Sequence, residues 1–361
     1  MRIVFILPGY PWRPVGGFRV VYEYANGLVA RGHDLAVVHP RNLRNWSPPP
    51  AHGSARLRRL AGRARNALFR PGVRWNPIDS RVRMLYVADP ATERIPDADA
   101  VVATAWQTAE YVAGYPASKG RKFYLIQHYE TWSGPRERVD ATWRAPMKKI
   151  VIARWLAAKG LELGVPAEDM VHIPNGIDHT RFRPVRPLDR RPSRAAMLWS
   201  PLEWKGAGHG LRAMELARAE RPGLEAILFG TGPTPGGLPA WAPYFRDPPQ
   251  RDLVERIYNG SGIYLCPSLA EGWALPPAEA MACGCALVAS DIGGVRDYAD
   301  DEVTALLSPA GQPEAMAANI LRLTADDGLR RRLAEAGRQR IADFTWPKST
   351  DLLEAELTAL R

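Results

Sequence analysis

Two glutamates, Glu271 and Glu279, lie eight positions apart in the segment EGWALPPAE. A carboxylate is an unfavourable neighbour for a phosphate, but it accepts hydrogen bonds readily from hydroxyl groups. The pair therefore predicts a ligand that is rich in hydroxyls, such as a sugar or a ribose.

The elements around the two glutamates predict an anion site beside them. The apolar run 263–266 is typical of a strand, and Pro276 or Pro277 marks the first turn of a helix, where a missing N–H costs nothing. Unpaired N–H groups at a helix start attract anions such as a diphosphate. We expect these N–H groups to come from Trp273, Ala274 and Leu275.

Short β-rich runs alternate with helical segments along the chain. The first are residues 3–7, a helical face over 20–29 that Gly32 closes, and residues 35–38. This strand–helix–strand order is the signature of a parallel sheet covered by helices. Further strands are expected at 100–103, 123–126, 150–152, 171–173, 195–200, 226–229, 263–266 and 286–289. Further helices are expected at 209–219, 252–259 and 276–283.

A linker separates the two halves of this pattern. Residues 174–194 hold four prolines and six arginines among 21 residues and show no apolar periodicity. We therefore expect an α/β protein with two doubly wound domains, residues 1–180 and 181–346.

The spacing at 104–107 fits a capping box, which places a helix start at the end of a strand. Open α/β sheets bind ligands at such positions. Thr104, Trp106 and Gln107 are therefore candidates for binding a second substrate, with a buried core tryptophan as the alternative for Trp106.

The composition of the 361 residues, 46% hydrophobic and 24% charged, is that of a globular protein and excludes disordered and collagenous chains. No stretch approaches the ~18 consecutive apolar residues of a membrane span, and the run 3–7 is too short for a signal sequence. We expect a cytoplasmic protein. Its three cysteines match neither a disulfide framework nor a zinc site and are expected to be small buried thiols: Cys266, Cys283 and Cys285.

Positive charge is concentrated in the first half of the chain. Residues 1–185 carry 28 lysines and arginines against 15 acidic residues, whereas residues 186–361 carry 20 against 23. This asymmetry predicts an anionic partner, which could be nucleic acid, a membrane or a phosphorylated substrate. Because no aromatic–basic recognition motif accompanies the charge, we expect no nucleic acid partner.

Part of this charge lies in residues 56–70, where arginines surround an apolar stripe with helical spacing. An amphipathic basic helix of this kind either lies on an anionic membrane or packs on its own domain. The first alternative implies peripheral contact with the inner face of the membrane.

Five motifs occur in the order of a known family. They are Gly16-Gly17, PNGID at 174–178, WKG at 204–206, the E-x7-E of Glu271 and Glu279, and Asp291-Ile292-Gly293-Gly294. With them the chain resembles the retaining GT-B glycosyltransferases of glycosyltransferase family 4. The resemblance implies two Rossmann-like domains that face a central cleft, the first binding the acceptor and the second a nucleotide-sugar donor. It also implies that a helix over 347–361 returns to the first domain.

Roles for single residues in the second domain follow from the resemblance. In similar enzymes the second glutamate binds the ribose hydroxyls of the donor, which points to Glu279. The first contacts the transferred sugar, which points to Glu271, assisted by the amides that follow Gly272. The lysine of the KG motif neutralises the diphosphate, which points to Lys205 with Gly206.

In the first domain the resemblance points to Gly16 and Gly17 as the loop that closes over the donor. A histidine at the end of a strand commonly touches the donor sugar in similar enzymes, and His128 is the candidate. The alternative is an ordinary loop histidine. The expected catalytic residues are thus His128, Lys205 and Glu271.

One position departs from the family pattern. Relatives carry an arginine shortly before the KG lysine, whereas this chain has Trp199-Ser200-Pro201. Arg19 is a candidate replacement. Because Lys205 and the helix amides can offset the charge of a leaving diphosphate, we expect no metal and no cofactor besides the nucleotide-sugar co-substrate.

The implied activity is transfer of a hexosyl group with retention of configuration. The acceptor could be a glycan, a lipid-linked molecule or a small aglycone, and the donor nucleotide depends on residues near 248–250. A nucleotide-sugar epimerase of the same fold is the alternative.

Overall fold

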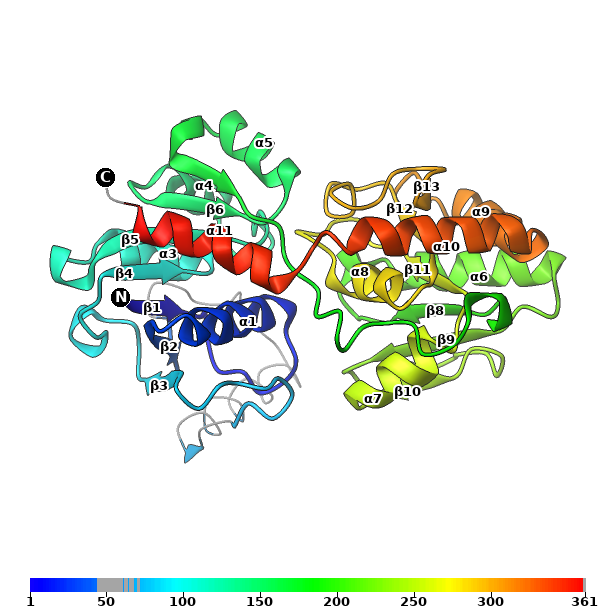
Figure 1. Cartoon of the computed structure of the whole chain (residues 1–361), viewed down its shortest axis with the longest axis horizontal. Helices are drawn as coiled ribbons and strands as arrows, with labels where there is room; N and C mark the ends of the chain where they lie inside the picture. Colours follow the sequence, from blue (N-terminus) through cyan, green and yellow to red (C-terminus); the bar gives the residue numbers. More distant parts are fainter. Residues whose placement is uncertain (44–60, 62–63, 65–67, 70–71, 360–361) are drawn as a thin grey trace. The chain divides into compact units, whose positions relative to one another are not determined.

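A computed structural model describes residues 1–43, 61, 64, 68, 69 and 72–359. The chain divides into two compact units (Figure 1). Unit 1 comprises Met1–Pro174 and Trp346–Arg361, and unit 2 comprises Asn175–Thr345. Each unit is an α/β domain built around one sheet whose paired strands all run parallel. The expected fold class of two parallel-sheet α/β domains is therefore confirmed.

Unit 1 contains a seven-stranded sheet in the order β3-β2-β1-β4-β5-β6-β7. Its strands are β1 Arg2–Ile6, β2 Asp34–Pro40, β3 Arg83–Val87, β4 Ala100–Ala103, β5 Arg121–Ile126, β6 Lys148–Val151 and β7 Met170–His172. In the centre, Val4 of β1 stands opposite Ala36 on one side and Val101 on the other. The strand order reverses between β1 and β4, so the carboxyl ends of these two strands form the topological switch point where such sheets bind ligands.

The helices of unit 1 are α1 Gly16–Ala30, α3 Trp106–Ala113, α4 Arg136–Arg144, α5 Arg154–Glu162 and α11 Trp346–Thr358. At the end of α1, Gly32 has φ +87 and donates its N–H to Val29, while His33 donates to Leu28. This is a Schellman arrangement, in which the left-handed residue favours glycine. The expected helix end at Gly32 is confirmed.

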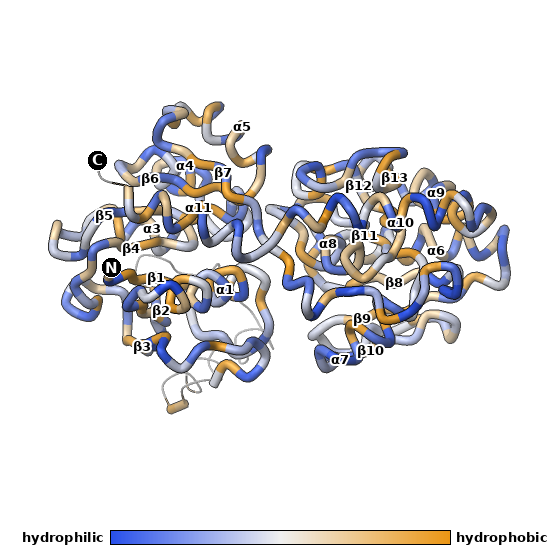
Figure 2. The backbone as a smooth tube through the Cα atoms, in the orientation of Figure 1, coloured by the Kyte–Doolittle hydropathy of each residue, from blue (hydrophilic) through white to orange (hydrophobic). Residues whose placement is uncertain are grey.

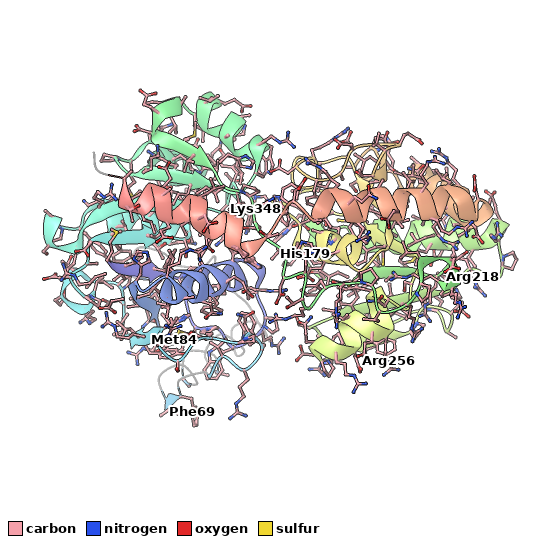
Figure 3. The ribbon with its side chains drawn as sticks, in the orientation of Figure 1. Phe69, Met84, His179, Arg218, Arg256 and Lys348 are labelled. Atoms are coloured by element: carbon pink, nitrogen blue, oxygen red, sulfur yellow. The ribbon has the colours of Figure 1, made fainter. Side chains whose placement is uncertain are left out.

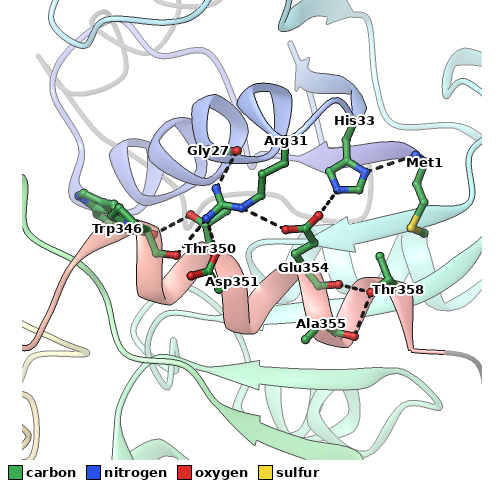
Figure 4. Close-up of polar contacts among 11 residues, drawn as sticks. Met1, Gly27, Arg31, His33, Trp346, Thr350, Asp351, Glu354, Ala355 and Thr358 are labelled. Atoms are coloured by element: carbon green, nitrogen blue, oxygen red, sulfur yellow. Dashed lines mark hydrogen bonds and ion pairs between the residues drawn. The ribbon is translucent and has the colours of Figure 1, made fainter.

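The C-terminal helix α11 lies against α1 (Figure 4). Arg31, at the end of α1, forms ion pairs with Asp351 and Glu354, and His33 Nε2 is 2.8 Å from Glu354 Oε1. Gly27 permits the close approach, because a Cβ there would lie 2.7 Å from Thr350 Oγ1. The last residues of the chain thus belong to unit 1 although unit 2 precedes them.

Unit 2 contains a six-stranded sheet in the order β10-β9-β8-β11-β12-β13. Its strands are β8 Ala195–Leu198, β9 Ala226–Gly230, β10 Tyr244–Arg246, β11 Ile263–Cys266, β12 Ala286–Ser290 and β13 Ala305–Ser308. Its helices are α6 Ala207–Glu220, α7 Gln250–Asp252, α8 Leu275–Ala282, α9 Pro313–Ala325 and α10 Asp327–Ile341, with a π-helical turn at Leu253–Tyr258. Here the switch point lies between β8 and β11.

Alternate residues of the unit 2 strands form a core with α6, α9 and α10. Met197, Leu228, Leu265 and Val288 belong to this buried cluster. Figure 2 shows hydrophobic stretches along the central strands, as expected for a parallel sheet that is covered on both faces. All three cysteines are buried and free, which confirms the prediction of small buried thiols.

Three strands, β3, β10 and β13, were not predicted from the sequence, and each lies at the edge of its sheet. An edge strand pairs on one side only, so it does not need the continuous apolar run that identifies a central strand. The expected helix at 252–259 is also different, because it is mostly the π-helical turn.

The expected basic helix at 56–70 falls almost wholly outside the described residues, so its contact with a membrane stays a prediction. Within the part of the chain that the structure describes, no helix has both the length and the apolar character required to cross a membrane.

Candidate functional site

Lys205 and Glu271 meet at the switch point of unit 2. Lys205 follows β8 and Glu271 follows β11, and these two strands are neighbours whose carboxyl ends lie at one edge of the sheet. Lys205 Nζ lies 2.8 Å from both carboxylate oxygens of Glu271. The sheet topology therefore brings together two residues that are 66 positions apart.

The ion pair is partly withdrawn from solvent, with side-chain exposures of 23% for Lys205 and 11% for Glu271. Ser268 Oγ also donates to Glu271 Oε1 at 2.8 Å. Two donors on one carboxylate fix its orientation, and reduced solvent screening strengthens the attraction. A small pocket here is lined by Leu198, Lys205, Cys266, Ser268, Glu271 and Pro276, among others.

Backbone contacts hold the WKG loop against the loop that carries Glu271. The carbonyl of Trp204 accepts the N–H of Leu269 at 2.7 Å. Gly206 adopts φ +60, and a Cβ there would lie 2.0 Å from the carbonyl oxygen of Pro267. Only glycine meets both conditions, which explains why it follows Lys205 in the motif.

A second glycine, Gly294, packs directly against Glu271. A Cβ at Gly294 would lie 2.5 Å from the Cβ of Glu271, and the carbonyl of Gly294 accepts the N–H of Ala274 at 3.2 Å. The expectation that the Ala274 N–H is free for an anion is therefore wrong, because the trailing DIGG motif occupies it. Trp273, Ala274 and Leu275 are all buried, and Ala274 is the N-cap of α8.

Glu279 lies in α8 and is only 3% exposed. Its Oε2 accepts a hydrogen bond from the Tyr258 hydroxyl at 3.1 Å. Burial and the charge of Glu279 raise the pKa of Tyr258 well above its ordinary value, so this hydroxyl stays a donor at physiological pH. A carboxylate has further lone pairs, so Glu279 can also accept from a ligand hydroxyl.

The thiol nearest to the ion pair is that of Cys266. Burial, followed by the nearby charge of Glu271, raises its pKa to about 11. A thiol with so high a pKa is not a nucleophile at neutral pH.

In unit 1, the glycine pair and His128 lie at the same edge of the sheet. Gly16 and Gly17 open α1 after β1, and Gln127, just after β5, donates from Nε2 to the carbonyl of Gly17 at 3.1 Å. The next residue, His128, has its ring 4.3 Å from the Trp132 ring and 5.5 Å from the Trp155 ring, between centroids. Trp132 is 47% exposed. An aromatic cluster therefore lies at this edge, just after β5.

A helix does start near residues 104–107, as expected, but Thr104 and Gln107 do not form the expected capping box. Thr104 donates to the carbonyl of Ile6, and Thr108 accepts the N–H groups of Thr104 and Ala105 instead. Thr104 is turned toward β1, so it cannot cap the helix. The N-cap of α3 is Ala105.

The structure places all three acceptor candidates in the interior. Trp106 is fully buried, and its indole N–H donates to Ser133 at 2.9 Å, while Thr104 and Gln107 are 4% and 7% exposed. Trp106 is therefore a buried core tryptophan, which was the alternative, and its ring presents no face on which a ligand could stack. The backbone N–H of Trp106 is accepted by Glu130 at 2.9 Å.

The chain contains one Asp-x-Asp triplet, Asp97-Ala98-Asp99. Two carboxylates at this spacing are a candidate metal site, so their partners bear on the expectation that no metal is needed. Asp97 pairs with Lys119 at 2.8 Å, and Asp99 with Arg2 at 2.8 Å. Both carboxylates thus have cationic partners at the amino end of β4, away from the carboxyl edge. Among the described residues, no group of three or more histidines, cysteines and acidic residues could hold a metal ion.

Three residues that complete the unit 2 site were not predicted from the sequence. Ser268 lies inside the segment already singled out, and a hydroxyl three positions before a glutamate gives a weak signal. Gly294 lies in a motif that was noted without a role. Tyr258 lies 21 positions before Glu279 and has no sequence signal at all.

Arg19, the expected replacement for a phosphate-binding arginine, lies in α1 with its Nε 3.9 Å from Glu23 Oε1. Its contact with a phosphate stays a prediction.

Comparison with known proteins finds that residues 246–340 match the family model described as glycosyl transferases group 1. This segment includes Glu271 and Glu279. A D-inositol 3-phosphate glycosyltransferase from Segniliparus rotundus is 28% identical over 215 residues, 52% of this chain and 47% of that protein. An alpha-maltose-1-phosphate synthase from Mycobacterium tuberculosis is 34% identical over 100 residues, 26% of each chain. The chain thus spans about half, or less, of the length of these curated relatives.

Solved structures resemble the whole chain. HepE of Anabaena in complex with UDP-glucose aligns over 100% of both chains with a TM-score of 0.73 and 15% identity. Sucrose-phosphate synthase from Thermosynechococcus elongatus aligns over 98% of both chains with a TM-score of 0.74 and 18% identity. At this identity the likeness establishes the fold, which is that of GT-B glycosyltransferases.

Proposed function

We propose that the protein is a retaining glycosyltransferase of family 4, which transfers a hexosyl group from a nucleoside-diphosphate sugar to an acceptor hydroxyl without a metal ion. The observation that carries the proposal is the Lys205–Glu271 pair at the switch point of unit 2, with Glu279 on the adjoining helix. The matched segment 246–340, which holds both glutamates, supports it.

The charges at this site fit cleavage of a bond between an anomeric carbon and a diphosphate. As that bond breaks, negative charge accumulates on the leaving phosphate, and a cation held in place stabilises it. Lys205 is such a cation, because Glu271 fixes its ammonium group before any ligand binds. Replacing part of this ion pair by a phosphate contact leaves Glu271 able to accept from the sugar hydroxyls.

Retention requires the acceptor to attack from the face that the diphosphate leaves. In this mechanism the acceptor oxygen bonds to the anomeric carbon, the bond to the diphosphate breaks, and the leaving phosphate takes the acceptor proton. No side-chain nucleophile is required, which is consistent with the raised pKa of Cys266.

The uridine diphosphate sugars are the first donors to test, because UDP-glucose is the ligand named for one structural neighbour. For the acceptor we propose an anionic molecule. The excess of basic residues in the first half of the chain supports this, as does the inositol phosphate in the name of several curated relatives. The cytoplasm, with peripheral contact at the membrane through residues 56–70, stays the predicted location, and flotation with anionic against neutral liposomes tests it.

The test starts with thermal shifts of the full chain against UDP-, GDP- and dTDP-linked sugars, because a bound donor raises the melting temperature by mass action. The donor that shifts the wild type but not Lys205→Ala is then incubated with inositol phosphates and lipid-linked acceptors. NMR of the product gives the anomeric configuration. An inverted product, or activity that EDTA abolishes and Mg²⁺ restores, contradicts the proposal.

The epimerase alternative is separated from the transferase by incubation with donor alone. A new nucleotide sugar identifies an epimerase, whereas slow release of free sugar identifies a transferase that lacks its acceptor.

A further inference from the structure

Unit 2 has a second pocket, whose walls are arginine and apolar side chains. It is open to solvent, has a cavity volume of about 210 Å³ and is lined by Arg186, Arg194, Ile227, Phe245 and Arg256. Figure 3 shows the Arg256 side chain at the surface of unit 2 beside α7. Among the residues that the structure describes, no acidic side chain lines this pocket.

The pocket lies at the opposite edge of the sheet from Lys205 and Glu271. Arg194 immediately precedes β8, and Ile227 is the second residue of β9, so both lie toward the amino ends of their strands. Lys205 and Glu271 follow the carboxyl ends of β8 and β11. Because all these strands are parallel, the pocket is separate from the candidate donor site.

Arg194 has donors that the protein does not satisfy. One Nη2 hydrogen bond goes to the carbonyl of Gly260, and Nη1 is 4.0 Å from Glu225, but Nε is buried without a hydrogen-bond partner. Burial lowers the pKa of Arg194, and the positive charge of Arg186 lowers it further. A buried, unpaired guanidinium N–H costs free energy that an anionic ligand can recover.

The other two arginines leave charge available at the rim. The Arg186 side chain is exposed and forms no hydrogen bond or ion pair within the described residues. Arg256 is 3.4 Å from Asp252, and its guanidinium carbon lies 5.1 Å from the centre of the Phe245 ring. Arg191 does not line the pocket: it is 4% exposed, donates to the backbone carbonyl of Arg186, and has its Nε and Nη1 buried without partners.

Two carboxylates face this cluster, and both lie outside the pocket lining. Glu225 is 67% exposed and Asp252 is 36% exposed. Exposed pairs are screened by solvent and contribute little. Three arginines line the pocket against two exposed carboxylates, and positive charge remains in excess.

We propose that this pocket binds a small soluble phosphate ester. Arg186, Arg194 and Arg256 bind the phosphate, because a guanidinium group donates to two phosphate oxygens at once. Ile227 and Phe245 contact the apolar part of the ester. The proposal concerns a second site and does not depend on the reaction at the first.

The test uses the full chain carrying Lys205→Ala, which weakens phosphate binding at the donor site. Isothermal titration calorimetry measures the Kd of two probes, inorganic phosphate and phenyl phosphate. Arg186→Gln and Arg256→Gln should each raise the Kd of both probes at least ten-fold. Arg251→Gln is the matched control, because Arg251 lies on α7, is 81% exposed and does not line the pocket. It should leave both Kd values within two-fold.

The apolar wall has its own readout. Phenyl phosphate should bind more tightly than inorganic phosphate, and Phe245→Ala should remove that preference while leaving the Kd for inorganic phosphate within two-fold. Equal Kd values in Arg186→Gln, Arg256→Gln and Arg251→Gln overturn the proposal. So does binding to phosphatidylglycerol vesicles in the absence of binding to either soluble probe.

Discussion

The two units place different chemistry at the carboxyl edges of their sheets. In unit 2 the switch point holds an ion pair with a third hydrogen bond from Ser268. In unit 1 the corresponding edge carries the glycine pair, Gln127, and the rings of His128 and Trp132. A charged group acts through its position, so several bonds must fix it, whereas an aromatic surface acts through its area and tolerates small shifts.

Net charge does not reveal this difference. The first half of the chain is strongly basic, yet an aromatic cluster of His128, Trp132 and Trp155 lies at the carboxyl edge of its sheet. The second half is slightly acidic overall, yet it contains the arginine pocket. Lys205 is also the single lysine among residues 175–345, and every other basic side chain of the lysine or arginine type in this range is an arginine. Local placement decides the role of a charge.

The largest effect should follow from removing the cation of unit 2. We expect Lys205→Ala to reduce kcat/KM about 100- to 1,000-fold, because the leaving diphosphate loses its fixed positive charge. Steady-state assays with the preferred donor measure this loss. Lys205→Arg should not restore full activity, since its planar group cannot reproduce the position of an ammonium nitrogen. Retention of wild-type activity in Lys205→Ala would mean that the ion pair is structural.

The next effect tests the backbone that positions Lys205. Gly206→Ala should destabilise unit 2 by about 3 kcal/mol, because the new Cβ meets the Pro267 carbonyl and the left-handed conformation is strained. Calorimetric melting of the full chain measures the change. Gly208→Ala is the control two residues later, where a Cβ meets nothing within 4 Å. If both variants melt alike, the close approach at Gly206 is not a constraint.

A smaller effect concerns the pH dependence of unit 1. Burial raises the pKa of Glu130 to about 7, and the hydrogen bond from Trp106 offsets this only partly. Folding therefore favours the protonated form of Glu130. The contribution of this group to the free energy of unfolding is complete below the unfolded pKa near 4.5 and is lost as the pH rises through 7. Wild type should lose on the order of 2 kcal/mol between pH 5 and pH 8 relative to Glu130→Gln.

Melting temperatures of both proteins across this pH range provide the measurement. Glu137→Gln, an exposed change on α4, serves as the control and should follow the wild type. Parallel curves for wild type and Glu130→Gln would show that Glu130 does not titrate in this range.

The smallest effect tests the aromatic edge of unit 1. Trp132→Ala should raise the KM for the acceptor about five-fold, equivalent to about 1 kcal/mol of lost ring contact. Kinetics with the acceptor found in the screen give this value, and Trp132→Phe should retain most of the affinity. Hydrolysis of the donor alone should not change. A rise in donor KM instead would assign the tryptophan to the donor.

The sequence by itself determined the fold class and most of the central strands, and it singled out four of the residues that the structure places in the unit 2 site, without Ser268, Gly294 and Tyr258. Central parallel strands are buried on both faces, so 263–266 and 286–289 appear as apolar runs between helices. Glu271 and Glu279 stood out because two carboxylates flank a helix start that Pro276 marks, whereas Lys205 and Gly206 were singled out by the WKG motif of the family that the chain resembles.

Only the tertiary structure decided which groups meet. The bond from Lys205 to Glu271, the hydroxyl of Tyr258 on Glu279, and the use of the Ala274 N–H by Gly294 all join residues far apart in the chain. The order of strands in the sheet creates these contacts, and sequence spacing does not encode that order. The burial of Trp106 and the clustering of Arg186, Arg194 and Arg256 have the same origin, because packing between elements decides which side chains reach solvent and which charges become neighbours.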